Sequence, residues 1–418
     1  MKKPELLSPA GNLTKLKIAL AYGADAVYAS VGNFSLRQRS AKEFDLETFS
    51  QGVVLAHEKG VKFYATVNGF PFNAQIEGLK KHIKMLGDLG VDGIIIATPG
   101  VINLAKEFAP NAEIHLSTQA NVMNYLDAEI YHQMGASRIV AAREMNLKDA
   151  LKIKQNNPNL EIEIFIHGSM CFAYSGRCLI SAVQSGRFSN RGACANDCRF
   201  SYELYAKNDE KGTLFKLEED ENGTYIMNSK DLNLSSYIEQ IIQSGAIDSF
   251  KIEGRTKSEY YVACTTNTYR QAIDDAMIGN FRAEIYEKEL ATLKNRGFTD
   301  GYLVHRPFER KNTQNLDSTQ DEGTHQVHAI SENGESFKSK GVLKKELSYE
   351  ILAPKSAKIL ETNNEIGRIY EKDSQFWLEF KVLKNINGKE FDEVHSGNLN
   401  EILSPVKLPE FSFLRKEI

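Results

Sequence analysis

The sequence has no long apolar segment and few cysteines, which excludes several classes of protein. No stretch approaches the roughly 20 apolar residues of a membrane-spanning helix, and no apolar run follows the two lysines of the opening MKKPELLSPAGN. Only five of the 418 residues are cysteines, and four of them lie between positions 171 and 198. This clustering argues against a disulfide framework spread over a secreted fold. We therefore expect a cytoplasmic protein without a membrane partner.

Several common catalytic motifs are also missing. The sequence has no GxGxxG or GxxxxGK[ST] phosphate loop, no HExxH zinc motif and no GxSxG nucleophile elbow. His57 and Glu58 lack the second histidine that a zinc motif needs. A net charge of -4 gives no general attraction for phosphates, so nucleic-acid binding would require a local basic surface.

What the chain does contain is a repeated β-α pattern. Its 42% hydrophobic and 25% charged residues are typical of a globular protein, and its length indicates two domains. Short β-branched runs alternate with stretches of helical periodicity, and a helix-ending glycine precedes several of them. The runs are Glu5–Leu7, Ala26–Ala29, Lys62–Val67, Gly93–Ala97, Glu113–Ser117, Arg138–Ala142, Glu161–Ile166 and Ser249–Glu253. Eight such units favour a closed α/β barrel of the TIM type, with an open doubly wound sheet as the alternative.

The pattern divides the chain into two domains. We expect a (β/α) barrel over 1–310 with a cysteine-rich insertion at 168–232, in which Tyr202–Ala206 and Tyr225–Asn228 form a hairpin. The polar stretch at 311–323 has no periodicity and is typical of a linker. Short alternating runs over 324–418 predict a small antiparallel β-barrel domain that serves in packing or docking.

Polar side chains follow the barrel strands, where such folds place their chemistry. The candidate site residues are Gln119, Asn121, Arg143, His167, Glu253, Arg255 and Lys257. The three cations of this set are suited to clamp the carboxylates or phosphates of a ligand, because guanidinium groups match such oxygens bidentately. We therefore expect an anionic ligand in the mouth of the barrel.

The cysteine cluster is the strongest signal in the chain. Cys171, Cys178, Cys194 and Cys198 are separated by six, fifteen and three residues. Thiolates suit iron-sulfur clusters and zinc alike, but structural zinc sites favour paired knuckles, and only the last pair approaches that spacing. An iron-sulfur cluster is the favoured interpretation, with zinc or unligated thiols as alternatives. Cys264 stands apart in a helical stretch, so we expect a buried thiol there.

The insertion is also locally basic. Arg187 and Arg191 are two of four arginines between 171 and 200, a segment that contains a single acid, Asp197. Together with nearby aromatic residues they offer phosphate neutralisation and stacking surfaces for single-stranded RNA. The arginines could equally bind cluster sulfurs or loop carbonyls, and the residues do not decide between these roles.

At these positions the chain resembles the collagenase-like peptidase family U32. The resemblance runs through PELLSPAGN, HLSTQANVMN, EIFIHGSMCFAYSGRCLIS, ACANDCR, MNSKDL and KIEGRTKSEYY. It implies a 4Fe-4S cluster on Cys171, Cys178 and Cys194, while the assignment of Cys198 as fourth ligand rests on its close spacing to Cys194. The branch that the chain most resembles implies conversion of the wobble uridine of tRNA to 5-hydroxyuridine, with prephenate as the required metabolite.

Combining the residues with this resemblance gives a working hypothesis. The insertion and the C-terminal domain would hold a tRNA anticodon stem-loop over the barrel mouth, and prephenate, a small dicarboxylate, would be bound by Arg143, Arg255 or Lys257. His167 or Glu253 would move a proton, and an electron donor is a further expected partner. The alternatives are a collagenase-like peptidase and a non-enzymatic scaffold. A peptidase could use Cys171 with His167, but that would take a ligand from the cluster.

Overall fold

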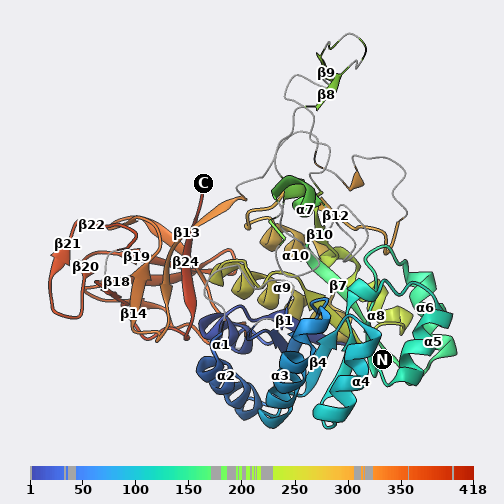
Figure 1. The fold of residues 1–418 in the computed structure, drawn as a ribbon. Helices are drawn as coiled ribbons and strands as arrows, with labels where there is room; N and C mark the ends of the chain where they lie inside the picture. The colour runs from blue at the N-terminus through green and yellow to red at the C-terminus, as the bar shows by residue number, and fades with distance from the viewer. Residues whose placement is uncertain are drawn as a thin grey trace.

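The computed structural model describes most of the chain. The described residues are 2–32, 34–35, 44–170, 180–185, 194–195, 197–199, 204–207, 210, 212, 214–217, 229–305, 312–313, 315, 323–355, 357–397 and 400–418. They form an α/β barrel, an insertion at one end of it, and a C-terminal unit of antiparallel strands (Figure 1).

Eight parallel strands close into a barrel. They are β1 (Glu5–Pro9), β2 (Ala26–Ala29), β3 (Lys62–Val67), β4 (Gly93–Ile96), β5 (Glu113–Leu116), β6 (Arg138–Val140), β7 (Glu161–Ser169) and β11 (Ser249–Ile252). Each pairs with the next, and β11 pairs with both β7 and β1. This closure confirms the TIM-like barrel and rules out the open sheet.

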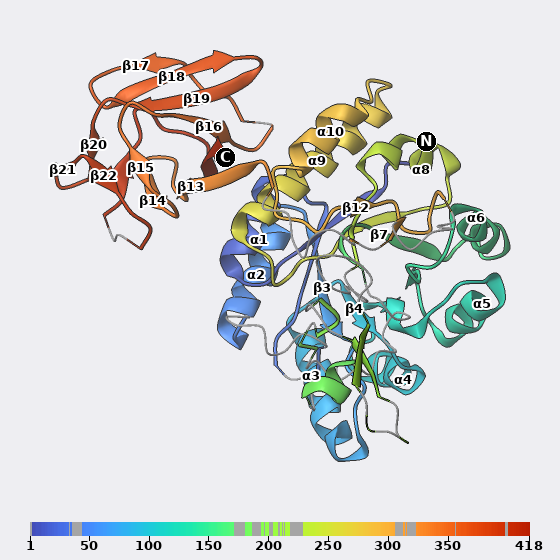
Figure 2. The same ribbon diagram turned by 90° about the horizontal axis from the view of Figure 1, so that it is seen from above.

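Helices surround the barrel, as the view from above shows (Figure 2). They are α1 (Leu13–Ala21), α2 (Leu46–Glu58), α3 (Ile76–Asp88), α4 (Pro99–Phe108), α5 (Tyr125–Met134), α6 (Leu147–Asn156), α8 (Ile238–Ser244), α9 (Glu259–Met277) and α10 (Ala283–Leu290), with 3-10 turns η1 (Asn73–Gln75), η2 (Thr118–Ala120) and η5 (Ser235–Tyr237). No helix in the described part of the chain is long and apolar enough to cross a membrane.

Local sequence explains where several of these helices begin and end. The α5 helix begins after Asn124, whose side chain accepts hydrogen bonds from two backbone N–H groups of the first turn. It ends at Gly135, which adopts φ 114°, a left-handed conformation that favours glycine. The same capping residues recur around the barrel, with an N-cap asparagine, Asn146, before α6 and a C-cap glycine, Gly245, after α8. Capping therefore helps to set the bounds of α5, α6 and α8.

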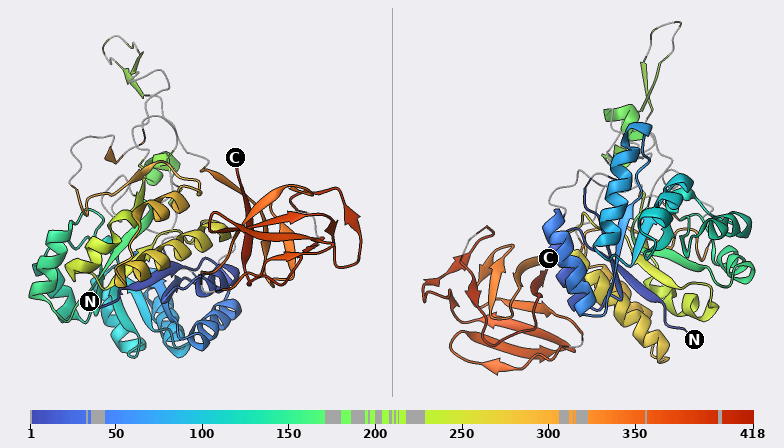
Figure 3. Two further views of the ribbon diagram at one scale, coloured as in Figure 1. Left: turned by 180° about the vertical axis from the view of Figure 1, so that it is seen from behind. Right: turned by 60° about the horizontal axis from the view of Figure 1, so that its bottom comes forward.

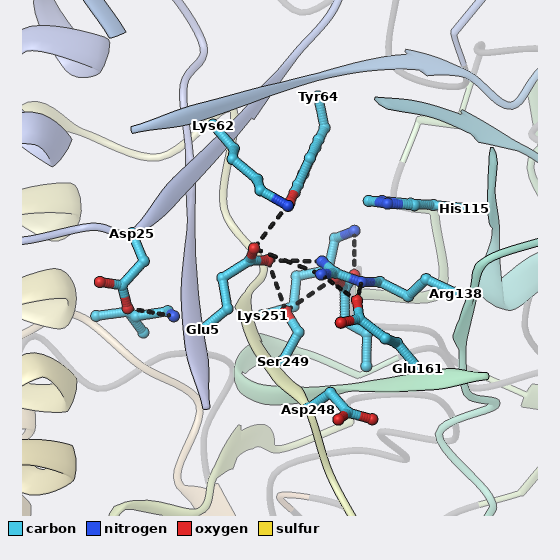
Figure 4. A network of polar contacts seen from close by, with 12 residues as sticks. Glu5, Asp25, Lys62, Tyr64, His115, Arg138, Glu161, Asp248, Ser249 and Lys251 are labelled. Atoms are coloured by element: carbon cyan, nitrogen blue, oxygen red, sulfur yellow. Dashed lines mark hydrogen bonds and ion pairs between the residues drawn. The ribbon is translucent and has the colours of Figure 1, made fainter. Parts of the chain in front are cut away.

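The end of the barrel where the strands begin is filled by a buried ionic network (Figure 4). Arg138 is 2% exposed and donates hydrogen bonds to Glu5 (2.6 Å), Glu161 (2.6 Å) and Glu163 (3.2 Å). Lys251 donates to the other oxygen of Glu163 at 2.7 Å. Burial alone would raise the pKa of the Glu163 carboxyl, but Lys251 and Arg138 outweigh it and lower that pKa to about 2. Salt bridges thus tie β1, β6, β7 and β11 together.

The insertion begins on an extension of β7. The last residues of β7 pair antiparallel with β10 (Asp231–Asn233), which pairs in turn with β12 (Phe298–Thr299). Between them lie α7 (Ile180–Ser185), η4 (Asp197–Arg199) and the strands β8 (Leu204–Lys207) and β9 (Leu214–Leu217). The β8 strand overlaps the predicted strand Tyr202–Ala206, but it pairs with β9. Its predicted partner, Tyr225–Asn228, lies outside the described residues.

The C-terminal unit consists of antiparallel strands, as predicted. Its main sheet has the order β17-β18-β19-β16-β24-β13-β14-β23, and two further pairs, β15-β22 and β20-β21, complete it. The strands are β13 (His325–Ser331), β14 (Ser336–Ser339), β15 (Leu343–Lys344), β16 (Ser348–Leu352), β17 (Thr362–Asn363), β18 (Gly367–Lys372), β19 (Gln375–Phe380), β20 (Leu383–Lys384), β21 (Glu390–Phe391), β22 (Glu393–Val394), β23 (Ile402–Leu403) and β24 (Ser412–Glu417).

This unit packs on the side of the barrel, while the β8-β9 hairpin projects from one end of it (Figure 3). Arg415 of β24 is 2% exposed and donates to Glu289 of α10 (2.8 Å), Glu350 of β16 (2.5 Å) and the Tyr260 hydroxyl of α9 (2.9 Å). The Tyr22 hydroxyl donates to the backbone oxygen of Phe411 at 2.9 Å. A buried polar contact therefore joins the two units.

Candidate functional site

The barrel mouth gathers polar side chains from the ends of several strands. Arg143 follows β6 and Glu253 follows β11, and their side chains approach to 3.7 Å. The Arg143 guanidinium lies over the ring of Phe165, 4.0 Å from its centroid. A cation stacked on an aromatic face and only loosely paired with a carboxylate retains donors for a further anion. The structure therefore brings two of the predicted residues together.

Of two predicted ligand-binding residues in the mouth, Gln119 is held by its neighbours and Asn121 has an acceptor without a partner among the described residues. The Gln119 side chain accepts a hydrogen bond from Ser117 (2.7 Å) and donates to the backbone oxygen of Asn68 (2.8 Å). Gln119 thus links the loops that follow β5 and β3. Asn121 adopts φ 58°, and its buried Oδ1 has no hydrogen-bond partner among the described residues. An orphaned acceptor at this position is a candidate contact for a ligand donor.

The other two cations of the predicted clamp contact residues other than those that Arg143 contacts. Arg255 is buried, and its guanidinium donates to the hydroxyls of Thr66 (2.9 Å) and Ser35 (2.8 Å). The Lys257 ammonium lies 5.4 Å from the centroid of the Tyr261 ring on α9. Arg255 thus connects the segment after β11 to β3 and to the loop after β2. A clamp formed by all three cations stays a prediction.

His167 lies in a buried aromatic cage. Its ring contacts Tyr261 and Tyr269 of α9 and Phe298 of β12, at centroid distances of 5.6–5.8 Å. The pairing of β7 with β11 shifts register just before Ile252, which pairs with His167. Because such an irregularity turns the following side chain, His167 contacts α9, on the outside of the barrel, whereas Phe165 contacts Arg143 in the mouth. The sequence had suggested that His167 faces the mouth.

The cage also fixes the charge and tautomer of His167. Desolvation, with a smaller contribution from Lys257, lowers its pKa to about 3, so the ring is neutral at physiological pH. Its Nδ1 lies 3.2 Å from the Tyr269 hydroxyl, whose single hydrogen faces the Ile166 oxygen (2.8 Å) and the Asn233 Oδ1 (3.1 Å). Nδ1 is therefore the donor, and Nε2 carries the lone pair.

Two of the four predicted cluster ligands lie in the described part of the chain. Cys194 is exposed and Cys198, in η4, is half-buried. The segment is held by a hydrogen bond from the Ala195 N–H to the Ser181 hydroxyl of α7 (3.1 Å). Cys171, Cys178, Arg187 and Arg191 lie outside the described residues. Within the described residues no group of three or more His, Cys, Asp or Glu side chains is arranged to hold a metal.

Cys264 is buried in α9, as expected for a structural thiol. Its sulfur lies near Glu289 and Thr292 at the contact with the C-terminal unit. Burial raises the pKa of this thiol well above its usual value, and Glu289 adds to the effect. Cys264 is therefore not a reactive thiolate.

A cavity beside the mouth was not foreseen from the sequence. It has a volume of about 670 Å³ and lies between β10, β12, η5 and α10. Its walls include Asn233, Tyr237, Glu287, Phe298, Asp300 and His305. These residues are scattered over more than 70 positions without a shared motif, so no local signal could have grouped them.

Comparison with known proteins places the chain in a family. The model for peptidase family U32 matches residues 11–313, which include the barrel from α1 onward and its insertion. The chain belongs to peptidase family U32. A Helicobacter pylori protein named tRNA hydroxylation protein P is 54% identical over 420 residues, with 100% of both chains covered. The Escherichia coli protein of the same name is 41% identical over 72% of this chain and 75% of its own. This U32 chain is also 33% identical to a collagenase of Porphyromonas gingivalis, over 72% and 73% of the two chains.

Proposed function

We propose that this U32 protein hydroxylates the wobble uridine of tRNA to 5-hydroxyuridine. The observation that carries the proposal is the 54% identity with the Helicobacter pylori tRNA hydroxylation protein P over the full length of both chains. That match includes the insertion and the C-terminal unit as well as the barrel. Because function resides in sites rather than in folds, an alignment that spans all three parts is stronger support than the barrel alone.

The cofactor of this proposal is a 4Fe-4S cluster on Cys171, Cys178, Cys194 and Cys198. The described pair supports this assignment in donor type, since both side chains are thiols on one short segment and Cys194 is exposed. Thiolates are the ordinary ligands of such clusters. When bound, the cluster would supply one-electron transfer, which an electron-donor partner would sustain. Zinc is the alternative occupant.

Prephenate is the proposed small-molecule partner, and Arg143 is the residue that we assign to it first. Arg143 lies over Phe165 and is 3.7 Å from Glu253, so a ligand carboxylate can replace a weak internal contact. Arg255 instead positions the wall of the mouth through Thr66 and Ser35. Glu253 is the carboxylate next to the proposed ligand and the better placed group for moving a proton. His167, neutral and caged, would position the segment that leads into the insertion.

The RNA partner would be a tRNA anticodon stem-loop. Arg187 and Arg191 would neutralise its phosphates, and the double variant Arg187→Glu, Arg191→Glu should weaken tRNA binding and flatten its salt dependence. This arrangement leaves the uridine to reach the barrel mouth as an unstacked base.

Nucleoside analysis of tRNA tests the function directly. A strain that lacks 5-hydroxyuridine would receive the wild-type gene, Cys171→Ser, Cys198→Ser, Arg143→Glu or, as a control, Lys84→Glu on the exposed surface of α3. We expect 5-hydroxyuridine with the wild type and the control, and its loss with the three site variants. Absence of the nucleoside with folded wild-type protein would refute the function.

Metal analysis of anaerobically purified protein tests the cofactor separately. About four irons and four sulfides per chain, lost in Cys171→Ser and Cys198→Ser, are expected for the cluster. One zinc per chain without sulfide would refute it.

Peptide hydrolysis is the second candidate, because one relative is named a collagenase. A Cys171 nucleophile with His167 as base would require the imidazole to leave its aromatic cage, in which it is 2% exposed. Gelatin cleavage by cluster-free protein, abolished in Cys171→Ser, would favour this function over hydroxylation.

A further inference from the structure

The cavity between β10, β12 and α10 has the features of a binding site for a flat ligand. Its volume of about 670 Å³ lies within the range of roughly 300–1,000 Å³ that is typical of small-molecule sites. Three of its walls carry rings, from Tyr237, Phe298 and His305. The rings of Tyr237 and His305 meet edge to face at 5.8 Å, so they support each other. Aromatic side chains in an open cavity provide stacking surfaces.

The cavity is also rich in hydrogen-bond acceptors. The Asp300 carboxylate holds the His305 ring through Oδ2 at 2.5 Å, and Glu287 accepts from the Ser236 hydroxyl through Oε1. The second oxygen of each carboxylate has no partner among the described residues. Burial, with smaller contributions from Asp300 and Glu287, raises the pKa of the Tyr237 hydroxyl. None of the described residues that line the cavity is Lys or Arg, so it disfavours a phosphate.

One donor complements these acceptors. The Oδ1 of Asn233 accepts hydrogen bonds from the Ser235 N–H (3.0 Å) and the Tyr269 hydroxyl (3.1 Å). Asn233 lines the cavity, and with its oxygen occupied in this way its Nδ2 group remains as the donor for a ligand. Tyr269 also contacts His167, and the Phe298 ring lies between the cavity and His167. The cavity is therefore connected to the segment that leads into the cysteine-rich insertion.

We infer that this cavity binds one unstacked nucleobase that carries an amine beside a ring N–H, and that guanine fits it best. The N1–H and exocyclic amine of guanine match a carboxylate such as Asp300, its O6 matches the Asn233 donor, and its ring can stack on Tyr237 or Phe298. Uracil offers a single N–H donor and two acceptors, so the two carboxylates disfavour it. This inference rests on the proposed tRNA function, and it assigns the cavity to a base other than the target uridine.

Nucleosides without phosphates are the direct probes. Titration calorimetry of the full-length protein should show guanosine binding at least about tenfold tighter than uridine. Asp300→Asn should weaken guanosine binding by about 5- to 150-fold, since a bidentate contact contributes about 1–3 kcal/mol. Glu284→Gln, on the α10 helix that carries Glu287 but outside the cavity, also removes one negative charge and should leave binding unchanged.

A second pair of variants tests the stacking surface. Tyr237→Ala should weaken guanosine binding about tenfold or more, whereas Tyr237→Phe keeps the ring and should retain most of it. Circular dichroism of each variant checks that it is folded, and Glu287→Gln replaces Asp300→Asn if the latter is unfolded.

The outcomes separate this inference from the proposed function. Equal binding of guanosine and uridine, or no effect of both acid variants, would overturn the nucleobase site even where tRNA hydroxylation is intact. Agmatine, a guanidinium probe, binding more tightly than guanosine would overturn it in favour of a cationic side chain of a protein partner. Guanosine binding that depends on Asp300 and Tyr237, in protein that does not hydroxylate tRNA, would uphold the site and refute the function.

Discussion

Replacing Arg138 by Leu tests whether the ionic network inside the barrel stabilises the fold. The guanidinium contacts three carboxylates, of which Glu163 is fully buried, Glu5 is 15% exposed and Glu161 is 34% exposed. Removing one partner of a buried ion pair costs about 3–5 kcal/mol, because the remaining charge is left unpaired. Glu163 retains Lys251 at 2.7 Å and Glu161 can be hydrated, so we expect the lower part of that range, about 3–4 kcal/mol.

The predicted pH dependence makes this expectation specific. In the wild type the Glu163 pKa is lowered from 4.5 to about 2, a shift that corresponds to about 3 kcal/mol of stability. That stability is present above pH 4.5 and is lost as the pH falls toward 2. Without Arg138 we expect the pKa of buried Glu163 to rise. Protonation of Glu163 at low pH then removes the unpaired negative charge that destabilises the variant. The difference in stability between the two proteins should therefore narrow from pH 7 to pH 4.

Urea unfolding can follow the two units of the chain separately. The described helices all lie in the barrel part, so far-UV circular dichroism reports on the barrel, while the single tryptophan, Trp377, lies in β19 of the C-terminal unit. The dichroism transition should shift more than the fluorescence transition. Lys84→Leu, which removes one cation from an exposed ion pair on α3, is the control and should change little. A loss below about 1 kcal/mol, or one that does not vary with pH, would refute the reasoning.

Three further predictions concern other parts of the fold. Arg415→Leu leaves the carboxylates of Glu289 and Glu350 at the interface without their cation, so we expect the free energy of unfolding to fall by about 3 kcal/mol. The dichroism and fluorescence transitions should then separate, and coincident, unshifted transitions would contradict this. Because the pKa of His167 is lowered to about 3 in the fold, this residue destabilises the fold as the pH falls below 6.5. Urea titrations at pH 7 and pH 5 should therefore show that His167→Gln loses about 2 kcal/mol less stability between these two values than the wild type does. Gly168 has φ 104°, and Gly168→Ala places a Cβ 2.5 Å from the backbone oxygen of Glu253, so the free energy of unfolding from thermal melts should fall by more than about 2 kcal/mol. Gly60 has open space around it, so Gly60→Ala should lower the free energy of unfolding by only about 1 kcal/mol.

The barrel was predictable because its signals are local. Each strand is a short β-branched run, and the adjacent helix caps, such as Asn124 and Gly135, act within one turn of chain. All eight predicted strands appear within about three residues of their expected ends. Closure of the barrel was not local, because it depends on the pairing of β11 with β1 across more than 240 residues.

The candidate site was predictable only in part. Strand ends meet at one mouth, so Arg143 and Glu253 could be expected to lie together. The direction of His167 depends on a register shift between β7 and β11, and a shift of one residue moves a side chain to the other face. No pattern within β7 contains that information.

Residue types and spacing in the chain were sufficient to indicate strands, helices, the cysteine cluster and the family. The partners of buried charges were not indicated, since Arg138 meets Glu5 only after β1 and β6 enter the same barrel. The same holds for the cavity, where Asn233, Tyr237 and Asp300 come from segments that are adjacent only in the folded chain. Local chemistry acts over a few residues of sequence, whereas ion pairs and cavities form between residues that folding brings within a few ångströms of each other.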